Sequence, residues 1–236
     1  MIVLPELSKL PQNFGKQYQM LFAEELENVT DFHRNRAGWF CASDILPLLS
    51  KGRGSAASQA LYTYIQEKAY ERHIGYAQPT KGGAASGWGL HFEAIALGAL
   101  GLIRNDKSFL IAEINLSATP DAMTETATVE IKCPYSFHHL TEYLSYSEPE
   151  QVKVGRFAAP SYYYQVIAQM ATTKKEIGYL YFYDVRQSEL QNRPIFKRIN
   201  FDGNEKVIKA DIDLVKTKCE EGFIILNDKI KDLWKG

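Results

Sequence analysis

The spacing of apolar residues predicts helices in the first part of the chain and short strands in the second. Apolar positions recur at helical intervals over about residues 11–32, and Ser55 is a good N-cap for a helix that stops at Gly75. Later apolar runs are short and bounded by turn residues, which is typical of strands. The other expected elements are a short helix at 44–49, a loop at 80–89, a helix at 90–101, strands at 108–116 and 127–134, a helix at 161–175, strands at 178–185 and 193–201, and one or two helices from about 204. This order predicts an α/β fold with a mixed central β-sheet flanked by helices.

The length of the chain and its lack of repeats indicate one domain over residues 1–236. We expect a helical part to about residue 105, a catalytic sheet core over about 106–200 and C-terminal helices over about 204–236. A chain of this size buries roughly 70% of its unfolded surface, so it needs neither a disulfide nor a metal to hold a core.

Several features predict a soluble protein of the cytoplasm. Its three cysteines, Cys41, Cys133 and Cys219, are far apart, which is typical of a reducing compartment. The start of the chain lacks the charged region and cleavage site of a signal peptide, and the apolar run Phe92–Ile103 is too short to span a membrane. The net charge of −1 gives no overall attraction to nucleic acid, but it leaves room for a local basic channel.

The segment 117–136 carries the residues with the clearest chemistry. Glu130 and Lys132 are two apart on a predicted strand, so both side chains project from the same face, and the alternate residues face apolar packing. Asp121 stands at the end of the preceding predicted strand. If the two strands pair as a hairpin, two carboxylates and a lysine converge at one end of a sheet.

Clustered carboxylates in a partly dry site repel each other unless a cation lies between them. Oxygen ligands with room for water are typical of Mg²⁺ or Mn²⁺, and such an ion activates water and stabilises the charge of a phosphoryl transition state. Lys132 adds a compact charge that can orient the nucleophile. The alternative is a surface hairpin whose Glu–Lys pair is worth roughly 0–1 kcal/mol. Against it, Glu130-Ile131-Lys132 is the only strict E-x-K of the chain.

An ordered set of short motifs resembles a known family. The segments TPD and VEIKCP are similar to the signature of PD-(D/E)xK nucleases, in particular of the lambda-exonuclease-like (YqaJ-type) phage recombination exonucleases. RAGWFCASDIL resembles the family's R-x-G-x-x-x-A-S segment, GWGLHFEAIA its W-G-x-x-x-E helix, and YYYQVIAQM its Y-x-x-Q-V-x-x-x-M helix. The set spans about Arg34 to Arg186, and it implies a restriction-endonuclease-like PD-(D/E)xK core. One departure is Ala122 after the Pro-Asp pair, where the family usually has glycine.

The resemblance implies a metal site and its catalytic residues. Asp121, Glu130 and the carbonyl of Ile131 would bind Mg²⁺, for which Mn²⁺ is the expected substitute. Glu93, a carboxylate on an otherwise apolar helix, would assist the metal. Lys132 would position the attacking water.

The resemblance also implies a pocket for the 5′-phosphate of a DNA end. Arg36, Ser43 and Thr119 stand at the matching positions, and an arginine can grip a phosphate through two donors. Ser43 also precedes the expected short helix, whose free N–H groups attract anions; its plain alternative is an N-cap. Spacing alone does not separate Arg36 from Arg34.

Two further pairs have weaker signals. Gln165 and Gln169 are four apart and share a helix face; the match favours Gln165 as the active-site glutamine, orienting water or DNA, and leaves Gln169 solvated or secondary. Lys51 and Arg53 form a basic loop that either contacts the DNA backbone or is a solvated turn. The tyrosines at 162–164 are expected in the core rather than on DNA.

The expected activity is Mg²⁺-dependent 5′→3′ digestion of one strand of linear double-stranded DNA. The exposed 3′ strand would pass to a single-strand-annealing recombination protein, and the resemblance implies a homo-oligomer in the form of a trimeric ring. One alternative is a restriction-type or structure-specific endonuclease, which has no need of an end-binding pocket. Another is a catalytically silent DNA-end-binding module, although the intact set of Asp121, Glu130 and Lys132 argues against it. The iron–sulfur nucleases of the superfamily are disfavoured because they use four cysteines and this chain has three.

Overall fold

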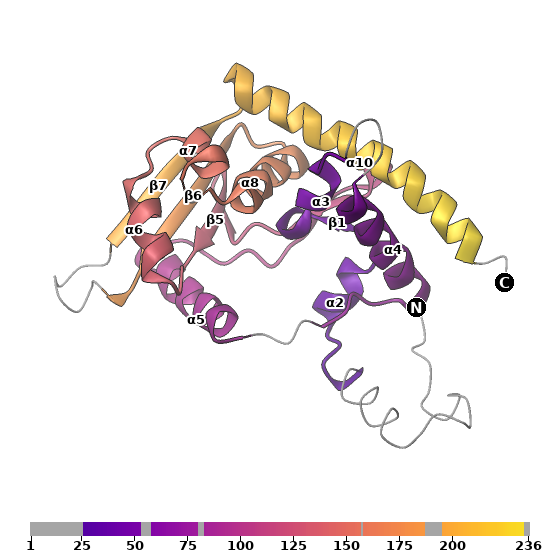
Figure 1. Ribbon diagram of the computed structural model, residues 1–236. Helices are drawn as coiled ribbons and strands as arrows, with labels where there is room; N and C mark the ends of the chain where they lie inside the picture. The colour runs from indigo at the N-terminus through magenta and orange to yellow at the C-terminus, as the bar shows by residue number, and fades with distance from the viewer. Residues whose placement is uncertain (1–25, 53–57, 80–82, 157, 187–194, 234–236) are drawn as a thin grey trace.

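The computed structural model describes residues 26–52, 58–79, 83–156, 158–186 and 195–233 (Figure 1). The helices in these ranges are α2 (Asp31–Arg36), α3 (Leu46–Leu49), α4 (Gln59–Ile74), α5 (Ala84–Ala99), α6 (Phe137–Ser145), α7 (Pro149–Val154), α8 (Pro160–Thr173) and α10 (Lys206–Leu233), with 3₁₀ turns η2 (Ala42–Asp44) and η3 (Ala112–Ile114). The strands are β1 (Phe40–Cys41), β2 (Phe109–Ile111), β3 (Leu116–Ala118), β4 (Ala122–Met123), β5 (Ala127–Lys132), β6 (Ile177–Asp184) and β7 (Ile195–Asp202). Most of the expected helix at 11–32 lies outside the described residues. None of the helices in these ranges has both the length and the apolar content needed to cross a membrane.

The strands form two mixed sheets rather than one central sheet. The larger sheet has the order β4-β5-β6-β7, in which β5 and β6 are parallel and the outer pairs are antiparallel. The smaller sheet has the order β1-β3-β2, with β1 parallel to β3. Helices pack against both sheets, and α10 runs along the outside of α8, α3 and α4 (Figure 1). The α/β fold class is therefore confirmed, with its strands divided between two sheets.

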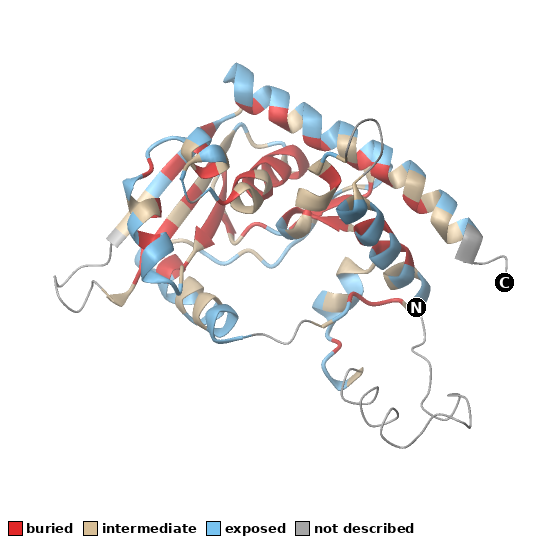
Figure 2. Cartoon of the chain, in the orientation of Figure 1, coloured by how far each residue is buried: buried red, intermediate tan, exposed pale blue. Residues whose placement is uncertain are grey.

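Helix α8 lies at the centre of the core. It contacts β5 and β6 of the larger sheet and β2 and β3 of the smaller one, and nearly all of its residues from Tyr163 to Thr172 are buried, as Figure 2 shows. Tyr163 is fully buried, and its two neighbouring tyrosines pack against the core. The expected helix at 161–175 and the core position of its tyrosines are confirmed.

The expected strand at 108–116 is wrong. This segment is broken into β2, η3 and β3, which form a hairpin. Asn115 adopts a left-handed conformation between them (φ 57°), and its side chain donates to the Gly38 carbonyl (2.8 Å) and accepts from Arg72. The partner of β5 in the larger sheet is therefore β4, which begins immediately after Asp121.

The helices also differ from expectation in their starts. Helix α4 stops at Gly75 as predicted (φ 84°), but it begins after Ser58, whose hydroxyl accepts from the Leu61 amide (3.1 Å). Helix α5 begins well before the expected position, so most of the expected loop at 80–89 is helical. The sequence pattern does not predict α6 and α7. The tail is one helix, α10, of 28 residues.

Candidate active site

Strand β5 positions Glu130 and Lys132 on the face that α8 covers. The alternate residues of the strand, Val129, Ile131 and Cys133, are buried in an apolar cluster with residues of α5. The alternation expected from the sequence is therefore confirmed. Since β5 is paired on both sides, by β4 and by β6, the position of Glu130 is fixed within the sheet.

Asp121 lies beside Glu130 because β4 pairs antiparallel with β5. Its Oδ2 accepts a hydrogen bond from the backbone N–H of Ile131 (2.7 Å). The backbone carbonyl of Asp121 accepts from the N–H of Asn105 (2.8 Å), and the Asn105 side chain donates to the Pro120 carbonyl (2.9 Å). The turn that carries Asp121 is thus held from both sides, and the predicted convergence of the two carboxylates is present.

Three donors hold the carboxylate of Glu130, which is 2% exposed. Lys132 Nζ donates to Oε1 (2.5 Å), and Gln165 Nε2 donates to the same oxygen (2.7 Å). Gln169 Nε2 donates to Oε2 (2.5 Å). The solvated position expected for Gln169 is wrong, because this side chain is fully buried and contacts the central carboxylate directly. Its secondary role stays a prediction.

Glu93 reaches the same site from α5. Its side chain is 15% exposed, and a terminal nitrogen of Arg104 lies 2.9 Å from its Oε1. The contact is ionic without hydrogen-bond geometry, so Oε1 of Glu93 has no hydrogen-bond partner among the described residues. Arg104 belongs to none of the motifs recognised in the sequence, which is why the pattern does not identify it.

The surroundings of the site disfavour the charged forms of two of its carboxyl groups. Burial, with Glu130 and Glu93 nearby, raises the pKa of Asp121 to about 8. Burial also raises the pKa of Glu93, against the opposing effect of Arg104. The pKa of Lys132 is raised, because Glu130 and Asp121 outweigh the opposing effect of burial. Raised carboxyl pKa values beside a buried carboxylate oxygen that lacks a hydrogen-bond donor are typical of a functional site that favours a cation.

The donor set fits a hard divalent ion. Asp121 and Glu130 offer carboxylate oxygens side by side, and Glu93 adds a third from α5. In the described part of the chain, no group of three or more His, Cys, Asp or Glu side chains is arranged so that it could hold a metal ion. Mg²⁺ as the bound ion therefore stays a prediction. The Ile131 carbonyl as a ligand stays a prediction.

One cleft of about 320 Å³ brings the metal residues and the phosphate residues together. The predicted residues that line it are Arg36, Ser43, Glu93, Thr119, Asp121, Glu130, Lys132 and Gln165. Gln169 and Arg104 line it as well. Lys51 is exposed and is not part of this lining, so its contact with DNA stays a prediction. Arg53 lies outside the described residues.

The residues expected to bind a phosphate belong to two separate hydrogen-bonded pairs. Arg36 donates to the Ser43 hydroxyl (2.9 Å), and Thr119 shares a hydrogen bond with Ser108 (2.8 Å). Arg34 lies 4.0 Å from Asp31 and does not line the cleft, so the structure separates the two arginines. Ser43 lies within the 3₁₀ turn η2, and its expected place before a helix at 44–49 is wrong.

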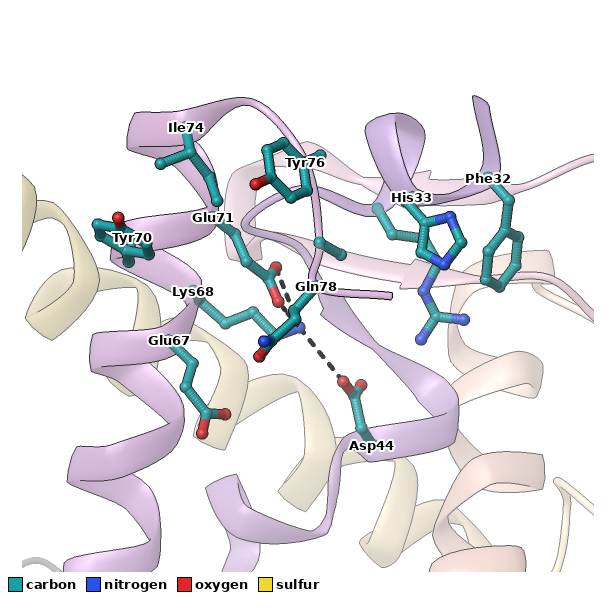
Figure 3. Close-up of a pocket in the computed structure, with 12 residues that line it drawn as sticks. Phe32, His33, Asp44, Glu67, Lys68, Tyr70, Glu71, Ile74, Tyr76 and Gln78 are labelled. Carbon is teal, nitrogen blue, oxygen red and sulfur yellow. Dashed lines mark hydrogen bonds and ion pairs between the residues drawn. The ribbon is translucent and has the colours of Figure 1, made fainter. Parts of the chain in front are cut away.

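A larger hollow of about 770 Å³ adjoins the cleft and shares Arg36 with it (Figure 3). Its centre is Lys68, whose Nζ lies 3.3 Å from Asp44 and 3.1 Å from Glu71. Glu71 in turn accepts from the N–H of Gly38 (2.9 Å). This buried group ties α4 to the segments that carry Arg36 and Ser43. Its charges satisfy one another, so we assign it a structural role and place the chemistry in the smaller cleft.

Comparison with known proteins agrees with this geometry. A family model of the YqaJ-like viral recombinase domain matches residues 31–176. The chain belongs to this family. Membership of this family, together with the likeness in fold to solved exonucleases, identifies a nuclease-type enzyme with a PD-(D/E)xK-like fold.

Solved structures show the same fold. The alkaline exonuclease LHK-Exo from Laribacter hongkongensis is 24% identical, with a TM-score of 0.63 over 87% of this chain and 96% of that chain. The same values hold for LHK-Exo in complex with dAMP. A phage related exonuclease from Haemophilus somnus 129PT is 13% identical, with a TM-score of 0.55 over 80% of this chain and 95% of that chain. No curated protein sequence matches the chain.

Proposed function

We propose that this YqaJ-type enzyme is a Mg²⁺-dependent exodeoxyribonuclease that digests one strand of linear double-stranded DNA in the 5′→3′ direction. The observation that carries the proposal is the single cleft that holds both the carboxylate–lysine set and the Arg36–Ser43–Thr119 group. A nuclease that cuts internally needs no site for a strand end. The pairing of the two groups therefore favours an exonuclease over an endonuclease.

Asp121 and Glu130 would hold Mg²⁺, with Mn²⁺ as a substitute, and Glu93 would assist. The bound ion would supply an activated water and stabilise the charge that develops on the phosphate. Gln165 and Gln169 orient Glu130 through one hydrogen bond to each of its oxygens. Lys132, which contacts Glu130, would position the attacking water.

Arg36 would bind the terminal 5′-phosphate through two donors, with the hydroxyls of Ser43 and Thr119 completing the pocket. A strand end held here would lie in the same cleft as Asp121. The product would be a 3′ single strand for an annealing recombination protein. A trimeric ring remains our prediction for the assembly, since each near-neutral protomer would then need only a narrow basic surface.

The test compares three DNA substrates in Mg²⁺: a linear duplex with 5′-phosphate ends, the same duplex with 5′-hydroxyl ends, and a covalently closed circle. We expect loss of the phosphorylated strand from its 5′ end, slower loss of the hydroxyl form, and an intact circle. Cutting of the circle would instead indicate an endonuclease. Binding without cleavage of any substrate would indicate a silent end-binding module.

Lys132→Ala tests the chemical role within the same assay. We expect DNA binding to be retained and the cleavage rate to fall by at least about a hundredfold, because a positioned proton-transfer or orienting group contributes roughly 10²–10⁴. Lys218→Ala is the matched control, since Lys218 pairs with Glu221 on α10, away from the cleft. Full activity of Lys132→Ala would remove this lysine from the mechanism.

A further inference from the structure

Arg104 stands in the cleft with its backbone fixed beside the carboxylates. It forms an isolated antiparallel bridge with Ala122, the residue after Asp121. The next residue, Asn105, donates its N–H to the carbonyl of Asp121 (2.8 Å). A change of the Arg104 side chain therefore leaves these backbone contacts in place.

The side chain of Arg104 is much less confined than its backbone. It is 57% exposed, whereas its partner Glu93 is 15% exposed. Their 2.9 Å contact lacks hydrogen-bond geometry. Lys68, by contrast, is 5% exposed and hydrogen-bonds to Glu71 within a closed group. The pair of Arg104 and Glu93 is thus loosely held and open to exchange.

The other two cations of the cleft each donate a hydrogen bond, which Arg104 does not. Arg36 donates to Ser43 and lies over the Phe32 ring at 4.8 Å. Lys132 donates to Glu130. Among the described residues, Arg104 pairs only with Glu93, which is one of the three carboxylates expected to bind a divalent ion. When that charge is taken up, the guanidinium is left in a cleft that receives a phosphodiester.

We propose that Arg104 binds a phosphate of the scissile strand and exchanges partners to do so: Glu93 in the metal-free protein, the phosphate once a divalent cation is bound. The proposal rests on the proposed function, because it assumes that the cleft receives DNA and a metal. A planar guanidinium offers two parallel donors to a phosphate. Without DNA, Arg104 and the metal then compete for Glu93. With DNA, Arg104 and the metal both attract the phosphate, so both strengthen DNA binding.

The substitution Arg104→Gln should therefore raise the affinity for metal and lower the affinity for DNA. In the absence of DNA, Mn²⁺ should bind about two- to five-fold more tightly by calorimetry, since a largely exposed ion pair no longer competes for Glu93. With metal bound, the affinity for a 5′-phosphorylated duplex should fall about tenfold or more, because a charge-assisted contact is lost. In a chelator, the DNA affinity should change little. DNA affinity is measured by fluorescence anisotropy in the Lys132→Ala background, where cleavage is not expected.

Two variants make the test specific. Arg104→Lys keeps the charge without the planar fork, so it should retain near-wild-type Mn²⁺ affinity and lose part of the DNA affinity. Arg34→Gln removes an arginine that pairs with Asp31 outside the cleft, and it should change neither quantity. Unchanged or weaker Mn²⁺ binding by Arg104→Gln, or DNA affinity that does not depend on metal, would overturn the proposal. A wild-type protein that binds neither Mn²⁺ nor DNA would instead refute the proposed function.

Discussion

Glu130 shows at the residue scale how hydrogen-bond donors surround a buried carboxyl group that lies beside two others. Its Oε1 has two donors, Lys132 and Gln165, whereas Oε2 accepts from Gln169. Removal of a donor from a buried charged group leaves that group with its desolvation penalty. Loss of Gln169 therefore leaves Oε2 without this donor, whereas loss of Gln165 leaves Oε1 with Lys132.

We predict that Gln169→Leu destabilises the metal-free protein by about 1–3 kcal/mol, because Oε2 of Glu130 then lacks its donor. Gln165→Leu should cost less, since Lys132 continues to donate to Oε1. Urea unfolding of both variants in a chelator measures the difference. The interpretation fails if Gln165→Leu is the more destabilising of the two.

At this scale, motifs identify residues that carry a fixed chemical type and spacing. Asp121, Glu130 and Lys132 could be predicted because the turn, the strand alternation and the E-x-K spacing agree. Gln169 lies on the same face of α8 as Gln165. Its burial depends on which sheet covers α8, and the sequence pattern of α8 does not contain that information. Arg104 has no local signal, since it enters the site only through the bridge to Ala122.

The packing of α8 against β6 sets the position of the glutamines at the scale of elements. Gly178 lies on β6 under this helix, and a Cβ at this position would stand 2.6 Å from Val166 Cγ1 and 2.9 Å from Met170 Sδ. Both contacts are shorter than van der Waals distance. The close approach of strand and helix thus requires glycine here.

We predict that Gly178→Ala destabilises the protein by about 1–3 kcal/mol, the usual cost of overpacking a core. Gly89→Ala on α5 is the matched control: a Cβ at this position would have no atom within 4 Å, so alanine should stabilise the helix by about 0.5–1 kcal/mol. Thermal unfolding of the two variants measures both effects. Equal stabilities would contradict the packing described for β6.

Elements with strong periodicity are the ones that the sequence predicts. α8, β5, β6 and β7 have long apolar patterns bounded by turn residues, and they are present near the expected positions. The hairpin of β2 and β3 could not be predicted, because the break at Asn115 depends on Gly38 and Arg72, far away in the chain. The start of α5 differs because two glycines, weak helix formers, are held in the helix by its wider context.

At the scale of the whole molecule, the chain has a net charge of only −1, and the cleft likewise has as many acidic as basic side chains. Its lining holds Arg36, Arg104 and Lys132 against Glu93, Asp121 and Glu130, so the formal charges balance once Asp121 is deprotonated. A polyanion therefore gains little attraction from the metal-free cleft. A divalent ion changes this balance, which links metal binding to DNA binding and to the stability of the fold.

The raised pKa of Asp121 determines how this link varies with pH. Its folded value of about 8 lies above the ordinary 3.8, because burial and the neighbouring Glu130 and Glu93 disfavour the charged form. The folded state therefore holds a proton that the unfolded chain releases, so the stability of the metal-free protein falls as pH rises from about 4 to about 8. A bound divalent ion replaces that proton and should offset the loss, because ligands that bind the folded state stabilise it.

We predict that Mg²⁺ or Mn²⁺ raises the midpoint of thermal unfolding more at pH 8.5 than at pH 5, by several degrees for an offset of about 1–2 kcal/mol in a chain of this length. Asp121→Asn removes the titrating group, so its metal-free stability should vary less across this range and its response to metal should shrink. Unfolding curves in chelator and in excess metal, at both pH values, give the comparison. An equal rise at both pH values would show that the ion stabilises the protein at a place other than these carboxylates. The charge balance of the cleft would then no longer explain how a near-neutral protein binds DNA.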